Sequence, residues 1–380
     1  MSGVNHPVSG LTAVDPIKSV RAVPRTYRLR SPFTFASSTL SELPYAIVRI
    51  ETESGLVGYG EAPAYWDPTG ESQGSVLGTI GLFGSALVDV NALSAEGAAR
   101  FLDRVSRGAW ATRMAIECAL LDITGKHYGV PAYLLLGGCA SNGRLTVPLN
   151  AVIPLADDDG ELREVVSRVV EEGFRYVKVK LSGEPTADEH RAKIVSGALP
   201  NGVRWFGDAN QAWASPKDAV NAIRRLEHFE PVFIEQPIAA DDLVGLAYVT
   251  RESPVKIAAD ESVLSTMDVI NILAYGTVDM VNIKLAKTGG PLQARVAAGA
   301  SHALRRPFVL GSMVEGALGM LANYHFGIAT TPLCAGLTAH WVIDDREDVG
   351  LSIRDGEIVA DNLRPGLGYP DAGVFEGLFS

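Results

Sequence analysis

Five charged residues, each placed where a short apolar run stops, recur at a nearly constant spacing through the middle of the chain. They are Lys180, Asp208, Glu235, Asp260 and Lys284, and the steps between them are 28, 27, 25 and 24 residues. A strand, a helix and two turns fill about 25 to 30 residues in a βα unit, so the spacing indicates one repeating strand-helix step. The repeat predicts a parallel sheet closed into a barrel, with all five side chains at the carboxyl ends of its strands. Helices are predicted between them at 188–199, 216–228, 241–250, 267–275 and 291–304.

The strand that carries the first of these residues also carries a second lysine. Residues 176–180 read Tyr-Val-Lys-Val-Lys, and alternate side chains of a strand lie on the same face, so Lys178 and Lys180 share one. With 145–150 as the first barrel strand, Lys180 ends the second strand and Lys284 the sixth, four positions apart in a barrel of eight. We therefore expect these two lysines to face each other across the barrel mouth, with the three carboxylates between them.

Three carboxylates on neighbouring strands, with no cysteine or histidine among them, suit Mg²⁺ or Mn²⁺ and not zinc. A divalent ion there can bind a substrate carboxylate and stabilise the charge that builds up when an α-proton leaves. A lysine acts as the base near neutral pH only when its pKa is lowered, and Lys178 and the metal are both placed to lower the pKa of Lys180.

The composition narrows the possible partners. The chain has 380 residues, 47% of them hydrophobic, which is enough for more than one domain. A formal net charge of −11 disfavours nucleic acid and anionic membranes as partners, and no apolar run approaches the roughly 18 residues of a membrane span. Cys118, Cys139 and Cys334 show neither disulfide nor metal spacing, which suits a reducing cytoplasm.

The hydrophobic pattern divides the chain into four parts. We expect a flexible tail at 1–14, an α+β capping domain at 15–143, the barrel at 144–342 and a C-terminal return to the capping domain at 343–380. In the capping domain the pattern predicts an antiparallel meander followed by two helices. The predicted strands are 19–30, 45–53 and 56–61, the helices 75–102 and 109–128, and the last two barrel strands 308–311 and 333–338.

Two loops of the predicted capping domain, 31–38 and 63–70, carry the aromatic residues Phe33, Tyr65 and Trp66. Aromatic loops beside a barrel mouth are what a substrate lid requires, although such residues also pack onto neighbouring surfaces. His340, near the end of the expected eighth strand, is a further candidate substrate contact, with a packing role as the alternative. Lys287 lies three residues after Lys284, but the spacing from Asp260 favours Lys284 as the acid/base residue.

Several motifs around these residues resemble those of the enolase superfamily, in its muconate lactonizing enzyme subgroup. The resemblance covers nearly the whole chain after the tail and implies an α/β fold, a (β/α)7β modified TIM barrel with an α+β capping domain. It also implies a homo-oligomer. The motifs are Val-Lys-Val-Lys at 177–180, Gly-Asp-Ala-Asn-Gln-Ala-Trp at 207–213, Ile-Glu-Gln-Pro at 234–237, Ala-Asp-Glu-Ser at 259–262 and Asn-Ile-Lys-Leu-Ala-Lys-Thr-Gly-Gly at 282–290.

The resemblance also implies a role for each site residue. Lys180 and Lys284 would be the acid/base residues, and Lys178 would support them electrostatically. Asn210 and Glu261 match motif positions that we place behind the metal ligands. The implied ligands of Mg²⁺ are Asp208, Glu235 and Asp260. A single carboxylate at a strand end is often a helix N-cap, but three of them at barrel spacing with two lysines opposite favour a site.

All reactions that this site supports begin with removal of a proton α to a carboxylate, through an enediolate. Return of the proton on the other face gives racemisation or epimerisation, which is the function we expect. The alternatives are a muconate-type cycloisomerase, a dehydratase similar to o-succinylbenzoate synthase, and a non-catalytic metal-binding scaffold. Loop 62–72 resembles that of dipeptide epimerases, but residues 337–341 lack the Asp-x-Asp of those enzymes. This difference favours an N-acylated or betaine-like amino acid, or a carboxylate without an amino group, over a dipeptide with a free amino terminus.

Overall fold

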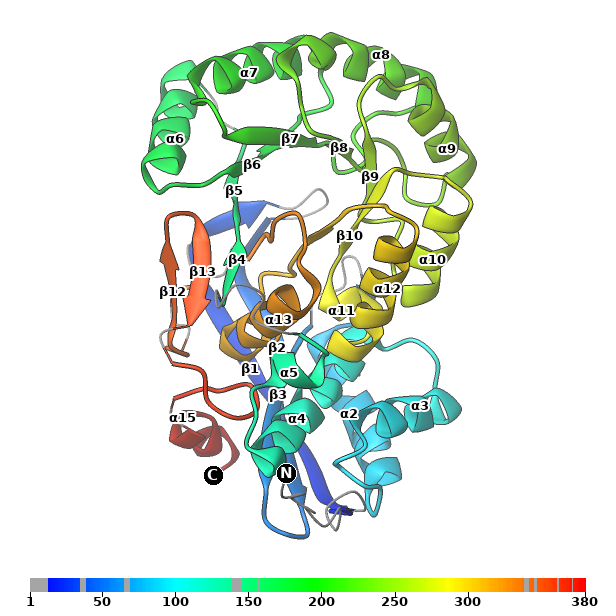
Figure 1. The fold of residues 1–380 in the computed structure, drawn as a ribbon, viewed down its shortest axis with the longest axis vertical. Coiled ribbons are helices and arrows are strands. Elements are labelled where there is room, and N and C mark those ends of the chain that lie inside the picture. Colours follow the sequence, from blue (N-terminus) through cyan, green and yellow to red (C-terminus); the bar gives the residue numbers. More distant parts are fainter. Residues whose placement is uncertain are drawn as a thin grey trace, which may run out of the picture.

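The structure is a computed structural model in which a small antiparallel sheet with its helices packs beside a barrel of parallel strands (Figure 1). Both the capping domain and the barrel that the sequence predicts are present. The structure describes residues 13–34, 39–64, 69–138, 145–155, 158–337, 342–344, 347–360, 362–370 and 372–380.

The capping sheet is the predicted antiparallel meander, with strand order β1-β2-β3. Its strands extend further than the sequence indicates: Thr34 pairs with Thr39, so residues 31–34 of the loop predicted at 31–38 continue β1, and residues 35–38 lie outside the described residues. The centre of β2, residues 45–50, is buried on both faces. The strands are β1 (Ile17–Thr34), β2 (Thr39–Thr52) and β3 (Val57–Pro63).

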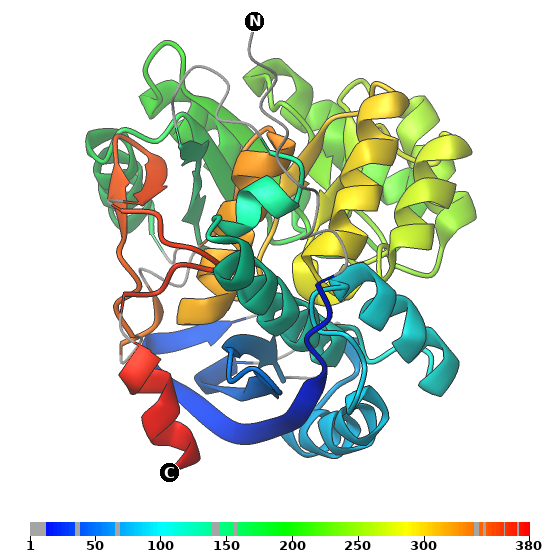
Figure 2. The same ribbon diagram turned by 60° about the horizontal axis from the view of Figure 1, so that its bottom comes forward.

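Helix α4 (Trp110–Tyr128) lies between the capping strands and the barrel helices (Figure 2). Two glycines of β3 let this helix approach the sheet closely: a Cβ at Gly60 would lie 1.9 Å from the carbonyl oxygen of Ala115. Helix α4 is buried over most of its length, so it forms the centre of the capping domain.

The helix predicted at 75–102 is two helices, α2 (Gln73–Leu87) and α3 (Ala95–Val105). Between them Asp89 adopts a left-handed φ of 67°. The break arises because this turn pairs with the start of β1: the Asp89 N–H donates to the Ile17 carbonyl, and the Ile17 N–H donates to the Val90 carbonyl. This tertiary contact thus divides a segment that the hydrophobic pattern alone assigns to one helix.

Seven parallel strands in the described residues form the barrel sheet, in the order β5 to β11, with helices around the outside (Figure 1). Several outer helices begin at side chains that accept backbone N–H bonds, such as Asp158, Ser215 and Ser265. The strands are β5 (Asn150–Ile153), β6 (Tyr176–Lys180), β7 (Arg204–Asp208), β8 (Ile234–Glu235), β9 (Ile257–Ala259), β10 (Met280–Ile283) and β11 (Phe308–Leu310). The helices are α6 (Asp159–Glu171), α7 (Pro185–Ala198), α8 (Pro216–Leu226), α9 (Leu243–Glu252), α10 (Thr266–Ala274), α11 (Leu285–Thr288), α12 (Pro291–Ala303) and α13 (Ala317–Thr330), with α5 (Ala132–Leu135) before the barrel and a 3-10 turn, η2 (Glu227–Phe229), after α8.

The predicted eighth strand is a short bridging segment around Ala335. Its backbone joins the two ends of the sheet, since Ala335 bridges both Leu310 of β11 and Leu149 beside β5. The Asn150 N–H donates to the Ala335 carbonyl at 2.9 Å, and the Gly336 N–H donates to the Leu310 carbonyl at 2.8 Å. These bonds close the barrel although the segment is too short to form a regular strand.

The prediction of one strand at 145–150 is wrong in its extent. Residues Thr146–Pro148 form β4, which pairs with β13 (Glu357–Ala360) in a second antiparallel sheet, and barrel pairing begins only at Asn150. The chain changes partners at Pro148, which has no N–H to give to a ladder. The third strand of that sheet is β12 (Leu351–Arg354).

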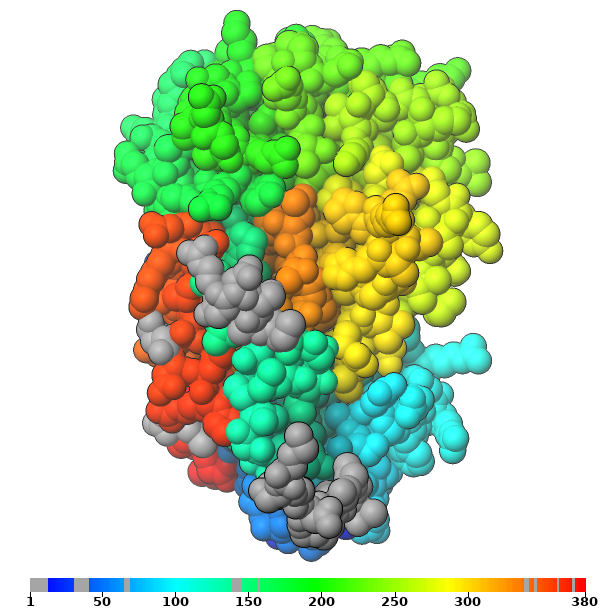
Figure 3. All heavy atoms as spheres, viewed as in Figure 1, coloured from blue at the N-terminus to red at the C-terminus, as the bar shows by residue number. Residues whose placement is uncertain are grey.

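The C-terminal segment runs along one side of the molecule from the barrel to the capping domain (Figure 3). Its last elements are α15 (Ala372–Glu376) and η3 (Gly377–Phe379). Glu376 accepts a hydrogen bond from the Arg49 guanidinium at 3.0 Å, and the Phe375 ring lies 5.7 Å from that of Tyr59. Among the residues that the structure describes, no helix is long and apolar enough to cross a membrane.

Candidate active site

The barrel brings the five predicted charged residues together at the carboxyl ends of neighbouring strands. Lys180, Asp208 and Glu235 are the last residues of β6, β7 and β8. Asp260 and Lys284 directly follow β9 and β10. This placement results from parallel pairing in register, which sets Lys180 opposite Asp208 and Asp208 opposite Glu235.

The lysines lie on both flanks of the row of carboxylates. Lys180 Nζ is 2.8 Å from Asp208 Oδ2 on one flank, and Lys284 Nζ is 2.8 Å from Asp260 Oδ2 on the other. Lys178, on the same face of β6 as Lys180, lies 2.8 Å from both Asp208 Oδ2 and Glu235 Oε1. The arrangement is the one expected from the strand numbering, with the carboxylates between two lysines.

The two residues predicted to lie behind the carboxylates form a chain of hydrogen bonds. Lys180 Nζ donates to Asn210 Oδ1 at 2.5 Å, and Asn210 Nδ2 donates to Glu261 Oε1 at 2.9 Å. Asn210 has a φ of 42°, a left-handed conformation that asparagine tolerates better than most residues. The chain links the lysine on one flank to the loop that follows Asp260.

Sequence reasoning missed three further residues that form hydrogen bonds with Glu235 or Asp260. Lys287, weighed only as a rival base, is completely buried and donates to Asp260 Oδ1 at 2.5 Å. Asn282 Nδ2 donates to Glu235 Oε1 at 2.9 Å, and Gln236 Oε1 accepts from the Asp260 N–H at 3.0 Å. Asn282 could have been found, because it lies two residues before Lys284 and therefore on the same strand face.

Burial and ion pairing act in opposite directions on the carboxylates. Burial would raise the pKa of Asp208, but Lys178 and Lys180 outweigh it and hold that pKa at about 2. Burial raises the pKa of Glu235 to about 8, since the charges of Asp208 and Asp260 oppose the effect of Lys178. The negative charge of the buried Glu235 carboxyl is therefore only partly balanced by the neighbouring lysine.

Lys178 and Lys284 are held in their protonated form by the surrounding carboxylates. Burial lowers the pKa of each, but Asp208, Glu235 and Asp260 together outweigh burial at Lys178, and Asp260 with Glu261 outweighs it at Lys284, so both pKa values are raised. Lys178 acts in the opposite sense on Lys284, because two nearby ammonium groups repel each other. A lysine could serve as a base here only once another positive charge has neutralised its carboxylate partner.

The residues of this site fit a divalent metal ion. Glu235 Oε2 is buried and has no hydrogen-bond partner in the described residues, which leaves a carboxylate oxygen for a cation. The donor set of Asp208, Glu235 and Asp260 supplies the hard oxygen ligands that Mg²⁺ prefers. Among the described residues, no three carboxylate, histidine or cysteine side chains are grouped so as to hold a metal ion, and lysine ammonium groups are paired with Asp208, Glu235 and Asp260.

The predicted substrate contacts cannot be placed. Tyr65, Trp66 and His340 lie outside the described residues, and Phe33 lies in β1 at a position whose side chain is not described.

Comparison with known proteins gives similarity along almost the whole chain. Residues 17–137 match the model of the mandelate racemase / muconate lactonizing enzyme N-terminal domain, and residues 161–370 match that of the enolase C-terminal domain-like family. A hydrophobic dipeptide epimerase of Enterococcus faecalis is 34% identical over 356 residues, which are 89% of this chain and 99% of the relative. An N-succinyl-L-Arg/Lys racemase of Bacillus cereus is 29% identical over 341 residues, 90% of this chain and 91% of the relative.

Two solved structures of such relatives superpose on almost the whole chain. The Enterococcus faecalis dipeptide epimerase, complexed with Mg and the dipeptide L-Leu-L-Tyr, superposes with a TM-score of 0.86 at 33% identity over 93% of this chain and 99% of that one. A substrate-liganded complex of the L-Ala-D/L-Glu epimerase of Bacillus subtilis has a TM-score of 0.86 at 29% identity, over 93% and 99% of the two chains.

Proposed function

The chain belongs to the mandelate racemase / muconate lactonizing enzyme family of the enolase superfamily, and we propose that it inverts the α-carbon of an amino acid acylated on its nitrogen. It is an isomerase of this family, with racemases and epimerases of carboxylate substrates as its relatives. What we add is the class of substrate, the metal and the role of each side chain. A homo-oligomeric state is part of the same proposal.

The observation that carries the proposal is the pair of lysines on opposite flanks of three buried carboxylates. Lys180 is paired with Asp208, and Lys284 with Asp260. A substrate held between them presents one face of its α-carbon to each lysine. One lysine takes the α-proton and the other returns a proton from the opposite side, which inverts the centre. Lys178, paired with Asp208 and Glu235, contributes positive charge where the substrate carboxylate would lie.

Asp208, Glu235 and Asp260 are the residues that would hold the metal, which we propose is Mg²⁺, with Mn²⁺ able to replace it. When bound, the ion supplies charge stabilisation for the substrate carboxylate as the α-proton leaves. Its charge would also replace the lysines as partners of the carboxylates, leaving Lys180 and Lys284 free to turn toward the α-carbon. The relative solved with Mg and a dipeptide supports this choice of metal.

The names of the relatives share one chemical feature. In L-Ala-D/L-Glu the D/L label falls on the second residue, whose nitrogen is acylated by the first, and an N-succinyl amino acid is also acylated on nitrogen. In both, the reacting carbon lies between a free carboxylate and an amide. We therefore propose this unit as the substrate class. Because the sequence lacks the Asp-x-Asp of dipeptide epimerases at 337–341, we favour acyl groups without a free amine.

The test is α-proton exchange in D₂O with Mg²⁺ present, followed by mass spectrometry and chiral chromatography. The panel contains N-succinyl and N-acetyl amino acids, dipeptides, betaines and muconate-type acids. Deuterium uptake with inversion on the N-acyl amino acids is the expected result. A product with a new ring or with water lost would replace the proposal with a cycloisomerase or a dehydratase, and Mg²⁺ binding without any exchange would favour a scaffold.

Substitution of one lysine tests the assignment of the two faces. Lys284→Ala should abolish inversion, since one face then lacks its acid/base group, and a loss of at least a hundredfold is expected for a removed general base. Lys217→Ala, on the exposed surface of α8, is the matched control and should leave the rate unchanged. Undiminished inversion in Lys284→Ala would contradict the assignment.

A further inference from the structure

Lys284 stands at the start of α11, a helix of four residues that directly follows β10. The same short helix carries Lys287, and the two lysines hold the two carboxylate oxygens of Asp260: Lys284 Nζ is 2.8 Å from Oδ2 and Lys287 Nζ 2.5 Å from Oδ1. Any shift of α11 therefore moves Lys284 relative to Asp260. What holds α11 in place decides where this lysine points.

The turn that ends α11 is pressed against α4 of the capping domain. Gly289 and Gly290 have φ values of 92° and 124°, which side chains other than glycine rarely adopt. A Cβ on Gly289 would lie 3.1 Å from the Trp110 ring, and a Cβ on Gly290 would lie 2.3 Å from Glu117 Oε2. The two glycines thus allow the turn to touch two side chains of α4.

Glu117 also fixes the helix on the far side of the turn. Its carboxyl is fully buried, and Oε2 accepts a hydrogen bond from the Leu292 N–H at 3.0 Å, in the first turn of α12. Burial raises the pKa of Glu117 to about 8, against the effect of the backbone N–H groups. Burying the Glu117 carboxyl is costly in desolvation, which indicates that its hydrogen bond to the Leu292 N–H has a structural role.

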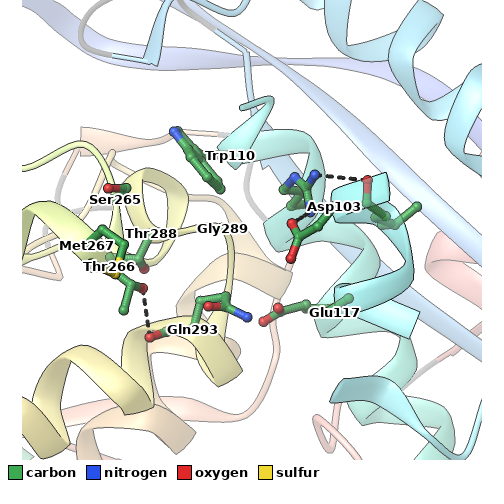
Figure 4. A pocket seen from close by; sticks show the side chains of 12 residues that line it. Asp103, Trp110, Glu117, Ser265, Thr266, Met267, Thr288, Gly289 and Gln293 are labelled. Carbon is green, nitrogen blue, oxygen red and sulfur yellow. Dashed lines mark hydrogen bonds and ion pairs between the residues drawn. The ribbon is translucent and has the colours of Figure 1, made fainter. Parts of the chain in front are cut away.

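One side of the turn borders a cavity. A cavity of about 330 Å³ lies between α3 and α4 of the capping domain and the loops before α10 and α12 (Figure 4). In Figure 4 Trp110 stands over this cavity and the Gln293 side chain points toward Glu117. The cavity is also lined by Asp103, Ser265, Thr266, Met267 and Thr288. Beside this unfilled space, the side chains that lie nearest to the two glycines are Trp110, Arg113 and Glu117 of α4, so these side chains help to hold the turn in place.

We propose that Glu117 and Trp110 are positioning residues for Lys284, so that the capping domain sets the geometry of proton transfer on one face of the substrate. Neither side chain contacts a residue of the five-residue charged cluster in the described structure. They act through Gly289, Gly290 and the start of α12. The inference rests on the proposed function, in which Lys180 and Lys284 serve opposite faces.

The experiment must resolve the two faces separately. The equilibrium constant between enantiomers is one, so a displaced Lys284 slows racemisation equally in both directions. Exchange of the α-proton with D₂O is different, because a lysine ammonium with three rotatable protons can return a deuteron to the face that it deprotonated. Exchange without inversion therefore reports each lysine on its own, with one enantiomer reporting Lys180 and the other Lys284. Lys180→Ala and Lys284→Ala assign the enantiomers.

In Glu117→Ala we expect exchange of the enantiomer that Lys284 serves to fall at least tenfold, since small displacements of a catalytic group have effects of that size. Exchange of the other enantiomer should stay within twofold. Glu117→Gln keeps an oxygen that accepts from the Leu292 N–H and should restore most of the lost rate. Trp110→Ala should shift the ratio of the two rates in the same direction, and it provides the test if Glu117→Ala does not fold.

Asp158→Ala is the matched control, because it also removes a carboxylate that accepts backbone N–H bonds at a helix N-terminus, on α6. It should leave the ratio of the two exchange rates unchanged. Equal slowing of both enantiomers in Glu117→Ala and Trp110→Ala, with an active wild type, would overturn the positioning role alone. A wild type that exchanges neither enantiomer of any N-acyl amino acid would overturn the proposed function, and this inference with it.

Discussion

Mg²⁺ should raise the melting temperature of the metal-free protein, and Glu235→Gln should remove most of that rise. Glu235 is fully buried, and its Oε1 accepts from Lys178 and Asn282. Its Oε2 has no partner in the described residues, and such an orphan acceptor in the protein interior is costly. A bound cation would satisfy this oxygen, and the isosteric amide would bind that cation far less well.

The size of the effect follows from linkage. A ligand that binds only the folded state at a hundred times its Kd stabilises it by about 2.7 kcal/mol. An unfolding entropy of about 2.1 cal/mol/K per residue gives about 0.8 kcal/mol/K for 380 residues, so the melting temperature should rise by about 3 °C. If Glu235→Gln weakens binding about a hundredfold, the same Mg²⁺ concentration contributes about 0.4 kcal/mol, or about 0.5 °C.

Differential scanning calorimetry after EDTA treatment, with and without Mg²⁺, measures both quantities. Without metal, Glu235→Gln should melt no lower than wild type, because burial already raises the pKa of Glu235 to about 8 and the amide resembles the neutral acid. Glu164→Gln, on the exposed surface of α6, is the control and should keep the full shift. The reasoning is refuted if Mg²⁺ leaves wild type unchanged, or if Glu235→Gln shows the same rise as wild type.

Two further predictions concern the capping domain. Gly60→Ala should lower the free energy of unfolding by about 1–3 kcal/mol, because its Cβ would overlap the Ala115 carbonyl. The control Gly78→Ala, at an exposed position of α2, should instead raise the free energy of unfolding by up to about 1 kcal/mol. Urea denaturation measures both values, and equal changes in the two variants would contradict the prediction. Burial raises the pKa of Glu61 from 4.5 to about 8, so its contribution to stability is lost as pH rises between these values. The melting temperature of Glu61→Gln should therefore rise relative to that of wild type between pH 5 and pH 9. Melting temperatures that change in parallel with pH in the two proteins would show the reasoning to be wrong.

The barrel and its charged residues could be predicted because both follow from local rules. A βα unit has a characteristic length, and a charged residue directly after an apolar strand marks the carboxyl end of that strand. Lys180, Asp208 and Lys284 needed only these two rules to be placed at one mouth. The order of the strands along the chain then predicts that the two lysines lie on opposite flanks of the carboxylates. The ion pairs of Lys180 with Asp208 and of Lys284 with Asp260 have this arrangement.

What could not be predicted depends on partners that are distant in the sequence. Thr146–Pro148 has the pattern of a barrel strand, but it pairs with Glu357–Ala360, about 210 residues further along the chain. Within 75–102 the chain divides into two helices at the turn where the backbone of Asp89 and Val90 pairs with that of Ile17. In both places a long-range backbone contact decides the structure, and periodicity carries no information about such contacts.

The charged residues of the site could likewise be predicted from local patterns, whereas the residues that we propose position them could not. Buried lysines and carboxylates are unfavourable for stability, so charged residues that end apolar strands are conspicuous in the sequence and indicate function. Nothing in the sequence distinguishes Glu117 in this way, because it is one of several polar residues within the buried helix α4. The positioning role that we propose for it depends on the contacts that Gly290 and Leu292 make with it in the folded chain. A residue that performs chemistry must differ from its surroundings, whereas a residue that positions another needs only the right neighbour. Sequence reasoning therefore finds the first kind, and the second kind is visible only in the folded structure.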